Sequence, residues 1–530
     1  MKKLNLIFCL LCVLITSAQN PESNLTNNMD SNFLRPGVGF VSISFDNLPE
    51  LNLQKDFNIP QFDLISIESP NENSNLKYND KLKYNSDQNY INKITEIVKN
   101  KFSGQFVSSL LYVENGEMNM DKIYNRIQYT LTEDQRRSMM NTSDGIDVSS
   151  RTRLLDPILD NNFLVVISLI DVKDVSGNDL KGYTSKFIYS VFKIEIGEGN
   201  DIQAKKNTFL SKYGSNSSEI SKNTFPVKHI VTGVSVSEST QPNLDGLSGI
   251  KKKIAEKILG KEGILTKSQL REKLDPSIVE MGVFMSTKSV DQFKPRSNVL
   301  DKNRLSLGKK EGLKIDDRFF SYEKVKNDKG EYVLERKGID RIKKVGNNDV
   351  ALTQNNLNTE IEKSSFYGDG GKKTRVGYLS VLNNDLGIGV SAFYRSSPGI
   401  RIDYRTRKIP NLMLYVEAEF LELNDVALVG GYGLGYYESL TGVLASIGIE
   451  KYLNIGRFLS IVPFAQGGIP YGMTDENGTE VELAEISLFY GLRIPLKFTK
   501  SIQLVPEYSM HSGTIPYEDS YLGASLRVSF

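Results

Sequence analysis

Three side chains near the C-terminus have the types and the spacing of a hydrolytic site. Glu507, Ser509 and His511 lie two residues apart, so in a β-strand all three point to one face. A serine, a histidine and a carboxylate can act as nucleophile, base and orienting group. The same side chains can instead form a structural hydrogen-bonded network. We favour the network, because the strand pattern described below turns all three toward the interior, away from any lipid substrate.

The rest of the chain offers little for other chemistry. The second histidine, His229, lies in a strand-like stretch with no companion ligand, which favours a structural role. The two cysteines, Cys9 and Cys12, fall within an apparent export signal, so the mature chain has no thiolate for catalysis, disulfides or zinc. A glycine-rich run at 368–374 lacks the glycine and the serine or threonine that a phosphate-binding loop requires. We predict no cofactor and no metal site.

The strand that carries the three candidates belongs to a series with the same alternation over residues 375–530. In the last segment every second residue is apolar, from Leu522 to Phe530, and small or polar residues stand between. A sheet that is apolar outside and polar inside must close on itself, since lipid offers no partner for an open edge. We predict an antiparallel transmembrane β-barrel of eight to ten strands. The expected strands are 375–382, 386–395, 399–407, 411–421, 424–437, 441–453, 457–467, 482–497, 500–510 and 520–530.

The predicted inner face of this barrel collects charges of both signs. The residues expected to form ion pairs there are Arg395, Arg401, Asp403, Arg405, Glu417, Glu419, Glu450, Glu485, Arg493, Glu507 and Arg527. Charges in a narrow interior are costly unless they are paired. Their near balance therefore predicts a crosslinked filling and no open channel. A soluble, lipocalin-like barrel would reverse the two faces, and the uniformly apolar outer runs disfavour it.

Strand number decides the orientation of the barrel. An even number places both of its ends on the periplasmic side, together with the region that precedes it. The loops at 475–478 and 514–517 would then face the outside. An odd number would invert this arrangement.

The first 88 residues contain an export signal and a polar segment. Lys2 and Lys3 precede a short apolar stretch, and small residues follow it, so we expect cleavage after Ala18 and a signal peptide at 1–18. Residues 19–88 are expected to be partly disordered, with a loop at 70–75. The apolar run Val38–Phe45 is the exception, and we interpret it as a strand of the next domain.

Residues 89–240 have the pattern of an α/β domain. Helical spacing is present at 91–98 and again at 123–131, and strand-like apolar runs lie at 163–170, 189–196 and 225–236. This order predicts a mixed sheet flanked by two helices.

The following segment, 241–300, has a helical pattern. Ile250, Ile254 and Ile258 share one face, and lysines occupy the rest. A basic amphipathic helix can bind anionic lipid headgroups. The apolar face is narrow, which favours a core-facing stripe with a solvated lysine face.

Residues 301–354 are predicted to form a small β module, and 355–374 a linker to the barrel. The turn Asn327–Gly330 predicts a hairpin within the module. The segment Gly312–Asp317 (GLKIDD) resembles the G-[LV]-K-x-[GD]-D turn of small barrel-like modules in periplasmic proteins of envelope machines.

The chain as a whole resembles exported outer-membrane β-barrel proteins of the Bacteroidota type, with an uncharacterised periplasmic region. Its barrel is similar in pattern to the small OmpA-like and OmpX-like barrels. The position of Ser509 and His511 near the outer rim resembles that of barrel hydrolases that deacylate lipid A. Those enzymes use His-x-Ser and a later glutamate, whereas the order here is Glu, Ser, His.

These patterns predict a non-enzymatic outer-membrane protein whose barrel anchors a periplasmic interaction domain. The implied partners are outer-membrane lipid and an envelope protein or the cell wall. A net charge of +1 provides no overall field for nucleic acid. A lipid-modifying barrel hydrolase using Ser509 and His511 and a small-solute porin are the alternatives.

Overall fold

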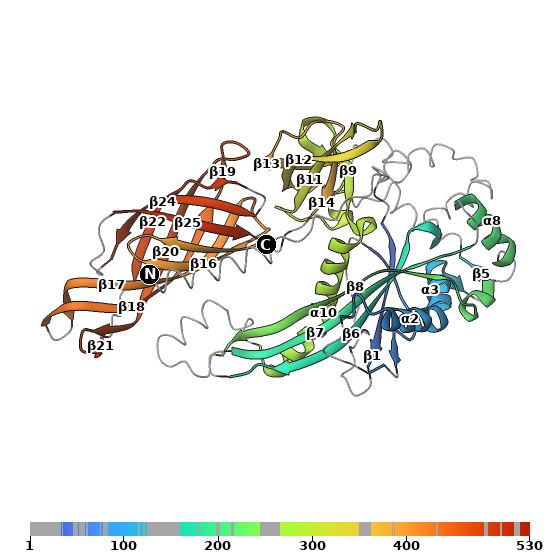
Figure 1. Cartoon of the computed structure of the whole chain (residues 1–530), viewed down its shortest axis with the longest axis horizontal. Helices are drawn as coiled ribbons and strands as arrows, with labels where there is room; N and C mark the ends of the chain where they lie inside the picture. Colours follow the sequence, from blue (N-terminus) through green and yellow to red (C-terminus); the bar gives the residue numbers. More distant parts are fainter. Residues whose placement is uncertain are drawn as a thin grey trace.

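The computed structural model describes residues 33–529 with gaps, of which the longest are 124–158, 244–264 and 349–361. The predicted signal peptide and the predicted basic helix at 250–258 lie outside the described residues. The described chain comprises an α/β region, a small β module and a closed antiparallel barrel (Figure 1). This confirms the predicted fold class.

The α/β region is built on a mixed sheet with the strand order β2-β1-β6-β7-β8, and β3 also pairs with β1. Strand β1 pairs in parallel with β2, β3 and β6, whereas β6, β7 and β8 are antiparallel. The strands are β1 (Gly37–Ser44), β2 (Asp63–Ile65), β3 (Asn71–Asn73), β6 (Asn162–Asp174), β7 (Leu180–Ile194) and β8 (Val227–Pro242); a separate two-stranded ribbon pairs β4 (Val113–Glu114) with β5 (Glu117–Met118). The predicted strand at Val38–Phe45 is confirmed. The loop expected at 70–75 is wrong in part, because β3 extends the sheet beside β1.

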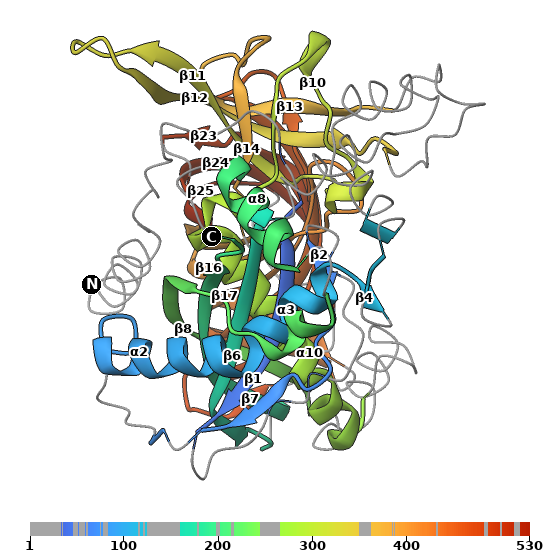
Figure 2. The same ribbon diagram turned by 90° about the vertical axis from the view of Figure 1, so that its right-hand side faces the viewer.

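Helices cover both faces of this sheet. On one face α2 (Gln88–Ile97) continues through a π-turn, η1 (Val98–Phe102), into α3 (Ser103–Leu110) (Figure 2). On the other face lies α10 (Lys267–Ser289). The remaining helical turns are α8 (Ile202–Tyr213), η2 (Ser217–Lys222), η5 (Asp291–Phe293), η6 (Asp301–Asn303) and η7 (Lys309–Glu311). Two flanking layers explain why β6 is a continuous apolar run: Leu164 packs toward α3 and Val165 toward α10.

The small β module is a six-stranded sheet with the order β10-β13-β12-β11-β14-β9. Its strands are β9 (Arg296–Asn298), β10 (Arg304–Leu305), β11 (Arg318–Lys326), β12 (Tyr332–Lys344), β13 (Ser364–Gly371) and β14 (Leu379–Leu382). The hairpin at Asn327–Gly330 is confirmed, with Gly330 in the left-handed conformation that the turn requires. The linker expected at 355–374 is wrong over its second half, because β13 pairs with β12 across the sheet.

The barrel has eight strands that close into a ring, since β15 pairs with β25 and β18 pairs with β20. The barrel strands are β15 (Ile388–Tyr394), β16 (Pro398–Arg405), β17 (Leu412–Gly430), β18 (Gly433–Lys451), β20 (Ser460–Asp475), β22 (Ser487–Arg493), β24 (Ile502–Ser512) and β25 (Ser520–Ser529). Three short strands join their ends: β19 (Leu453–Asn454), β21 (Glu480–Val481) and β23 (Leu496–Lys497).

Two of the ten expected strands do not belong to the wall of the barrel. The segment 375–382 contributes β14 to the small β module. The segment 424–437 is the outer part of one long hairpin, in which β17 and β18 pair from Leu412 and Lys451 out to Gly430 and Gly433. With eight strands, both ends of the barrel lie at the same rim, beside the module (Figure 1).

Candidate functional site: the barrel interior and the docked module

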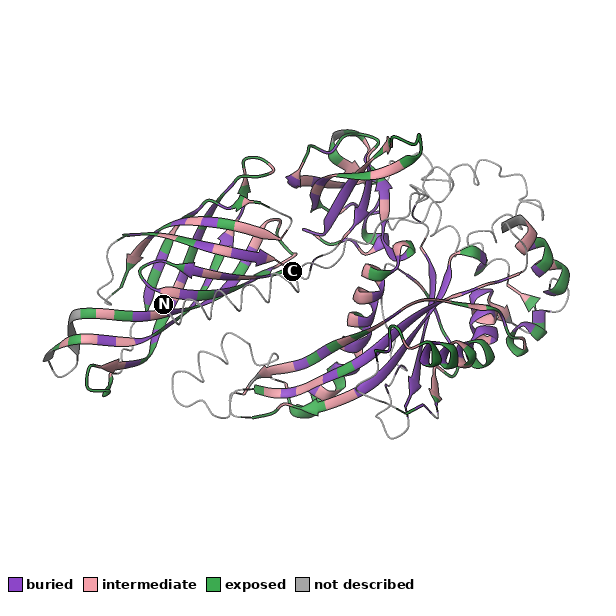
Figure 3. Ribbon diagram, viewed as in Figure 1, coloured by how far each residue is buried: buried purple, intermediate pink, exposed green. Residues whose placement is uncertain are grey.

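The outer wall of the barrel is an apolar surface. Along β16 the side chains of Ile400, Ile402 and Tyr404 are exposed, while the alternate residues are buried. The same alternation runs round the ring, as Figure 3 shows. Other exposed apolar residues of the wall are Leu414, Val416, Val443, Ile447, Ile449, Ile469, Leu488, Tyr490, Leu492, Leu504, Tyr508 and Leu522. These residues form an apolar surface around the barrel, much larger than the scattered apolar residues of a soluble surface.

The interior of the barrel is a network of arginines and carboxylates. Glu507 accepts hydrogen bonds from Arg395 (2.8 Å), Arg401 (3.2 Å) and Arg493 (2.7 Å). Glu417 bridges the same three arginines at 2.6–3.2 Å. All of these side chains are at most 5 % exposed. Shared carboxylates therefore lock four strands and the turn after β15 to one another across the lumen.

Further pairs extend the network along the barrel in both directions. Arg395 binds Glu419 at 3.0 Å, and Arg493 binds Glu450 at 2.6 Å. Arg527 pairs with Asp403 and donates to the hydroxyl of Tyr452. Of the predicted lumen residues, Glu485 lies outside the described part of the chain. Arg405 does point inward, but its carboxylate partner is Asp316 of the small β module.

Aromatic rings fill the space between the charges. The guanidinium of Arg493 lies 3.7 Å from the ring centroid of Phe464 and 4.8 Å from that of Tyr415. Arg395 lies over Phe393 at 4.8 Å. Toward the far rim, a layer of buried apolar side chains that includes Leu421 occupies the same interior. The lumen is therefore packed from the charged layer to the far rim.

The predicted catalytic candidates lie on β24 but do not form a relay. Glu507 is committed to three arginines, and the described contacts include no hydrogen bond between Ser509 and His511. Ser509 is fully buried, and the His511 ring packs on Phe489 with centroids 4.9 Å apart. Glu507, the carboxylate that would orient the histidine of a triad, is thus bound to arginines instead.

Variants of the two candidate residues test this interpretation directly. We expect Ser509→Ala and His511→Ala to leave the lipid A profile of the producing cells unchanged, because Ser509 Oγ has no hydrogen bond to His511 and Glu507 is held by three arginines. Mass spectrometry of extracted lipid A measures this. Loss of a deacylated species in either variant, with normal barrel assembly, would restore the hydrolase hypothesis.

Ion pairs dock the small β module on one rim of the barrel. Asp316 is fully buried and accepts from Arg405 Nη1 (3.1 Å), from the backbone N–H of Asn411 (2.8 Å) and from the hydroxyl of Tyr367 (2.7 Å). Arg405 ends a barrel strand and Asn411 lies in the following turn. One carboxylate therefore joins the module to two points of the barrel rim.

Three other contacts surround this one. Arg407 pairs with Asp317 at 3.4 Å, and Arg457 donates to Asp340 at 2.8 Å. Lys497 pairs with Asp369 at 2.5 Å. The arginine and lysine residues come from successive turns of the barrel, so the module is held around the rim.

This docking role was not predicted from the sequence. Gly312 lies in the left-handed conformation at φ 72°, and the GLKIDD segment then turns both of its aspartates into the interface. A signal was present in the sequence: two adjacent aspartates after a glycine turn, matched by Arg405 and Arg407 in the barrel. Nothing in that pattern says that the two segments meet.

Burial and neighbouring charges together shift the pKa values of the docking carboxylates in different directions. Desolvation raises the pKa of Asp317 to about 6, against the attraction of Arg407. Desolvation also raises the pKa of Asp340. Burial opposes ionisation of Asp369 too, but Lys497 and Arg341 outweigh it and hold the pKa of that carboxyl well below its usual range. Asp369 is therefore ionised wherever Asp317 titrates.

The stability of the module is expected to fall as pH rises from about pH 4 to about pH 6, between the ordinary pKa of an aspartate and the folded pKa of Asp317. A carboxyl whose pKa is raised on folding stabilises the fold when protonated, and this contribution is lost as pH rises through its folded pKa of about 6. Asp317→Asn is neutral throughout and can still accept from the Lys314 N–H. We expect it to flatten the dependence on pH by about 1–3 kcal/mol, measured by urea unfolding at several pH values. Identical pH profiles for the two proteins would contradict this assignment.

The described residues contain no group of histidine, cysteine and carboxylate side chains suited to a metal ion. His229 accepts or donates a hydrogen bond with Thr232 at 2.8 Å and packs against Phe192. Within the described part of the chain, no helix combines the length and apolarity needed to cross a bilayer.

No family model and no curated protein matches this chain. Solved structures match part of this chain. The N-terminal β-barrel domain of Pseudomonas aeruginosa OprF is 13 % identical, with a TM-score of 0.20, and the match covers 28 % of this chain and 98 % of that one. A major outer membrane protein from Thermus thermophilus is 14 % identical, with a TM-score of 0.18 and coverage of 27 % and 98 %. A designed transmembrane β-barrel is also 14 % identical, with a TM-score of 0.16 and coverage of 27 % and 92 %.

Proposed function

We propose that this protein is a non-enzymatic outer-membrane protein whose barrel anchors a periplasmic interaction region. The observation that carries the proposal is the arrangement of the barrel wall. Exposed aliphatic and aromatic side chains cover the outside, and buried, paired charges fill the inside. Water favours the opposite arrangement, whereas hydrocarbon requires this one.

The filled lumen supports an anchor rather than a porin. Glu417 and Glu507 hold three arginines in the middle of the barrel, and an apolar layer follows toward the far rim. On the opposite side the module covers the rim through its own ion pairs. To cross the barrel, a solute would have to displace the paired charges of the lumen and the ion-paired module at the rim, and both are buried.

Orientation follows from the unequal rims of the barrel. At the rim beside the module the strands are joined by short connections, such as 406–411. At the other rim β17 and β18 extend as a long hairpin, and β21 lengthens the connection after β20. Outer-membrane barrels have short periplasmic turns and longer external loops. The module and the α/β region then lie in the periplasm, where an envelope protein or the cell wall is the partner we propose.

Two measurements on the full chain test barrel closure and orientation. A folded barrel in detergent should migrate differently before and after boiling. In intact cells the region before the barrel should resist an added protease that cannot cross the outer membrane. Equal mobility, or cleavage of that region in intact cells, would overturn the anchor or its orientation respectively.

Conductance separates the anchor from a porin. We expect the purified protein in planar bilayers to show no ion conductance above the bare membrane, because paired arginines and carboxylates block the lumen. A matched open porin serves as the positive control. Stable single-channel steps from this protein would favour solute passage.

A further inference from the structure

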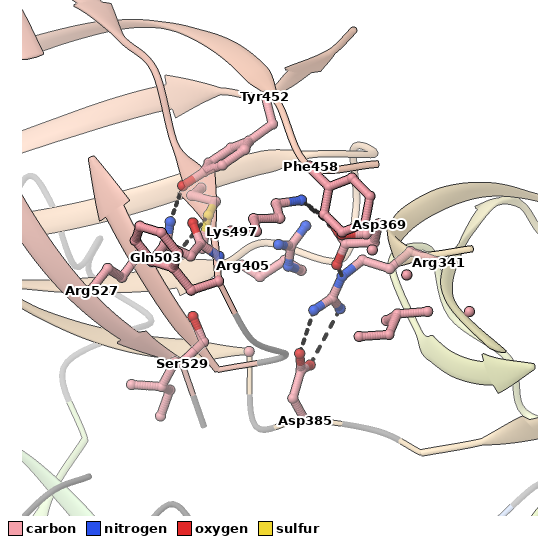
Figure 4. A pocket seen from close by; sticks show the side chains of 18 of the residues that line it. Arg341, Asp369, Asp385, Arg405, Tyr452, Phe458, Lys497, Gln503, Arg527 and Ser529 are labelled. Carbon is pink, nitrogen blue, oxygen red and sulfur yellow. Dashed lines mark hydrogen bonds and ion pairs between the residues drawn. The ribbon is translucent and has the colours of Figure 1, made fainter. Parts of the chain in front are cut away.

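A cavity of about 250 Å³ lies where the small β module meets the rim of the barrel. Strands β12 and β13 and the segment before β15 provide one side of it, and the turns and strand ends of the barrel provide the other. Figure 4 shows the side chains of Arg405 and Lys497 between Arg341 of the module and Arg527 of the barrel. Four glycines also line the cavity, Gly338, Gly370, Gly371 and Gly387, so few side chains occupy it.

Cations outnumber anions on the walls of this cavity. The basic lining residues are Arg336, Lys337, Arg341, Arg405, Lys497 and Arg527. The acidic ones are Asp369 and Asp385, and both are already bound by Arg341. Other carboxylates that pair with these cations, such as Asp316 and Asp403, lie outside the lining. The cavity itself therefore presents a positive surface to any occupant.

Two buried arginines on this surface have N–H groups without a hydrogen-bond partner among the described residues. Among the described residues, Arg405 uses only Nη1, toward Asp316, of the five N–H donors that an arginine carries. Arg527 is 4 % exposed, and its Nε has no hydrogen-bond partner in the described structure. A buried guanidinium with unused donors is costly unless something accepts from it. Planar N–H donors of this kind match the oxygens of a phosphate group.

Aromatic side chains stand beside the basic walls. Phe458 and Phe498 line the cavity and are 59 % and 67 % exposed. Both come from turns at the rim that we place at the periplasmic face of the membrane. Aromatic residues at that level lie among lipid headgroups, with the hydrocarbon beginning beside them. A ligand with a phosphate and an apolar tail can use both parts of this surface at once.

We propose that this cavity binds the phosphate of an anionic phospholipid headgroup, with the acyl chains lying along the outer wall of the barrel. The proposal rests on the membrane location proposed above. The bound headgroup would accept from Arg405 and Arg527 of the barrel and from Arg336 of the module, and would so bridge the two. The lipid would then act as a structural part of the docked arrangement.

Native mass spectrometry of the full chain in detergent tests this, with phosphatidylglycerol, phosphatidylcholine and inorganic phosphate added separately. We expect phosphatidylglycerol to remain bound at about tenfold lower concentration than phosphatidylcholine, as charge-assisted contacts would provide. Equal retention of the two lipids would overturn the proposal. Binding of inorganic phosphate as tight as that of phosphatidylglycerol would assign the cavity to a free anion and overturn the lipid ligand.

Variants assign the binding to the cavity. Arg405→Gln is expected to weaken phosphatidylglycerol binding about tenfold. Arg336→Gln changes an exposed residue of the cavity lining and should weaken phosphatidylglycerol binding about two- to threefold. If Arg405→Gln does not fold, the Arg336→Gln result alone tests the site. Arg375→Gln, at an exposed arginine of the same module outside the cavity, should change nothing. The change in gel mobility on boiling, measured in parallel, shows whether the barrel is folded. A folded barrel with no preference for phosphatidylglycerol would refute this binding site without affecting the proposed anchor function.

Discussion

Glu507→Ala is expected to destabilise the barrel by about 3–5 kcal/mol. The side chain accepts from Arg395, Arg401 and Arg493, all of them buried. Its removal leaves three guanidinium groups in the lumen with Glu417 as their main shared partner, and the desolvation of those groups is no longer offset. The cavity left by the glutamate adds to the loss.

Urea unfolding in lipid vesicles, followed by the mobility shift on boiling, measures this effect. Glu480→Ala is the matched control, because Glu480 is an exposed carboxylate of the same barrel and should change stability by less than about 0.5 kcal/mol. An effect of Glu507→Ala as small as that of the control would mean that the lumen is hydrated. The packed interior, and with it the argument against a channel, would then fail.

Asp316→Ala is expected to release the small β module from the barrel rim. The carboxylate is fully buried and receives Arg405, the Asn411 N–H and the Tyr367 hydroxyl, so its loss leaves three donors without their acceptor. Each buried unsatisfied donor costs about 1–3 kcal/mol. Residue 316 also lies at φ 65°, a conformation that aspartate and asparagine tolerate better than alanine. Together these losses are larger than the free energy that one ion pair at the barrel rim contributes.

Limited proteolysis and hydrogen exchange of the segment that connects β14 to β15 report on docking. Asp316→Ala should expose this segment while the mobility shift of the barrel persists. Asp316→Asn keeps one acceptor and the backbone preference, so it should have an intermediate effect. Asp328→Ala changes an exposed carboxylate at the hairpin tip of the same module and should behave as wild type. Undisturbed exchange in Asp316→Ala would mean that the module is held by other contacts.

The barrel could be predicted from the sequence because its signal is local. Alternation with a period of two assigns Ile400 outward and Arg401 inward without knowledge of any neighbouring strand. The same rule placed Glu417 and Arg493 in the lumen, where they meet. The alternation assigns an apolar outer face and a charged inner face to each strand separately. A closed barrel satisfies these assignments for all strands together.

The docking of the module could not be predicted, because it depends on pairing between distant segments. Asp316 and Arg405 are separated by most of the module and by the first barrel strands, and no local pattern relates them. The strand Ser364–Gly371 was missed for a similar reason: its glycines and charges indicate a loop, and its pairing with β12 overrides that preference. The eight strands lie within the predicted range of eight to ten, but the list of ten segments was too long where one hairpin exceeded the length that its turn residues suggested.

The absence of tryptophan from the chain allows a direct test of the central claim, that the apolar wall of the barrel faces lipid. Ile447→Trp places a single fluorophore at an exposed position on β18, and Tyr332→Trp places one at an exposed position of the module. In vesicles containing brominated lipid, we expect strong quenching at position 447 and none at position 332. Quenching of position 447 by aqueous acrylamide, with no effect of brominated lipid on a folded barrel, would contradict the account.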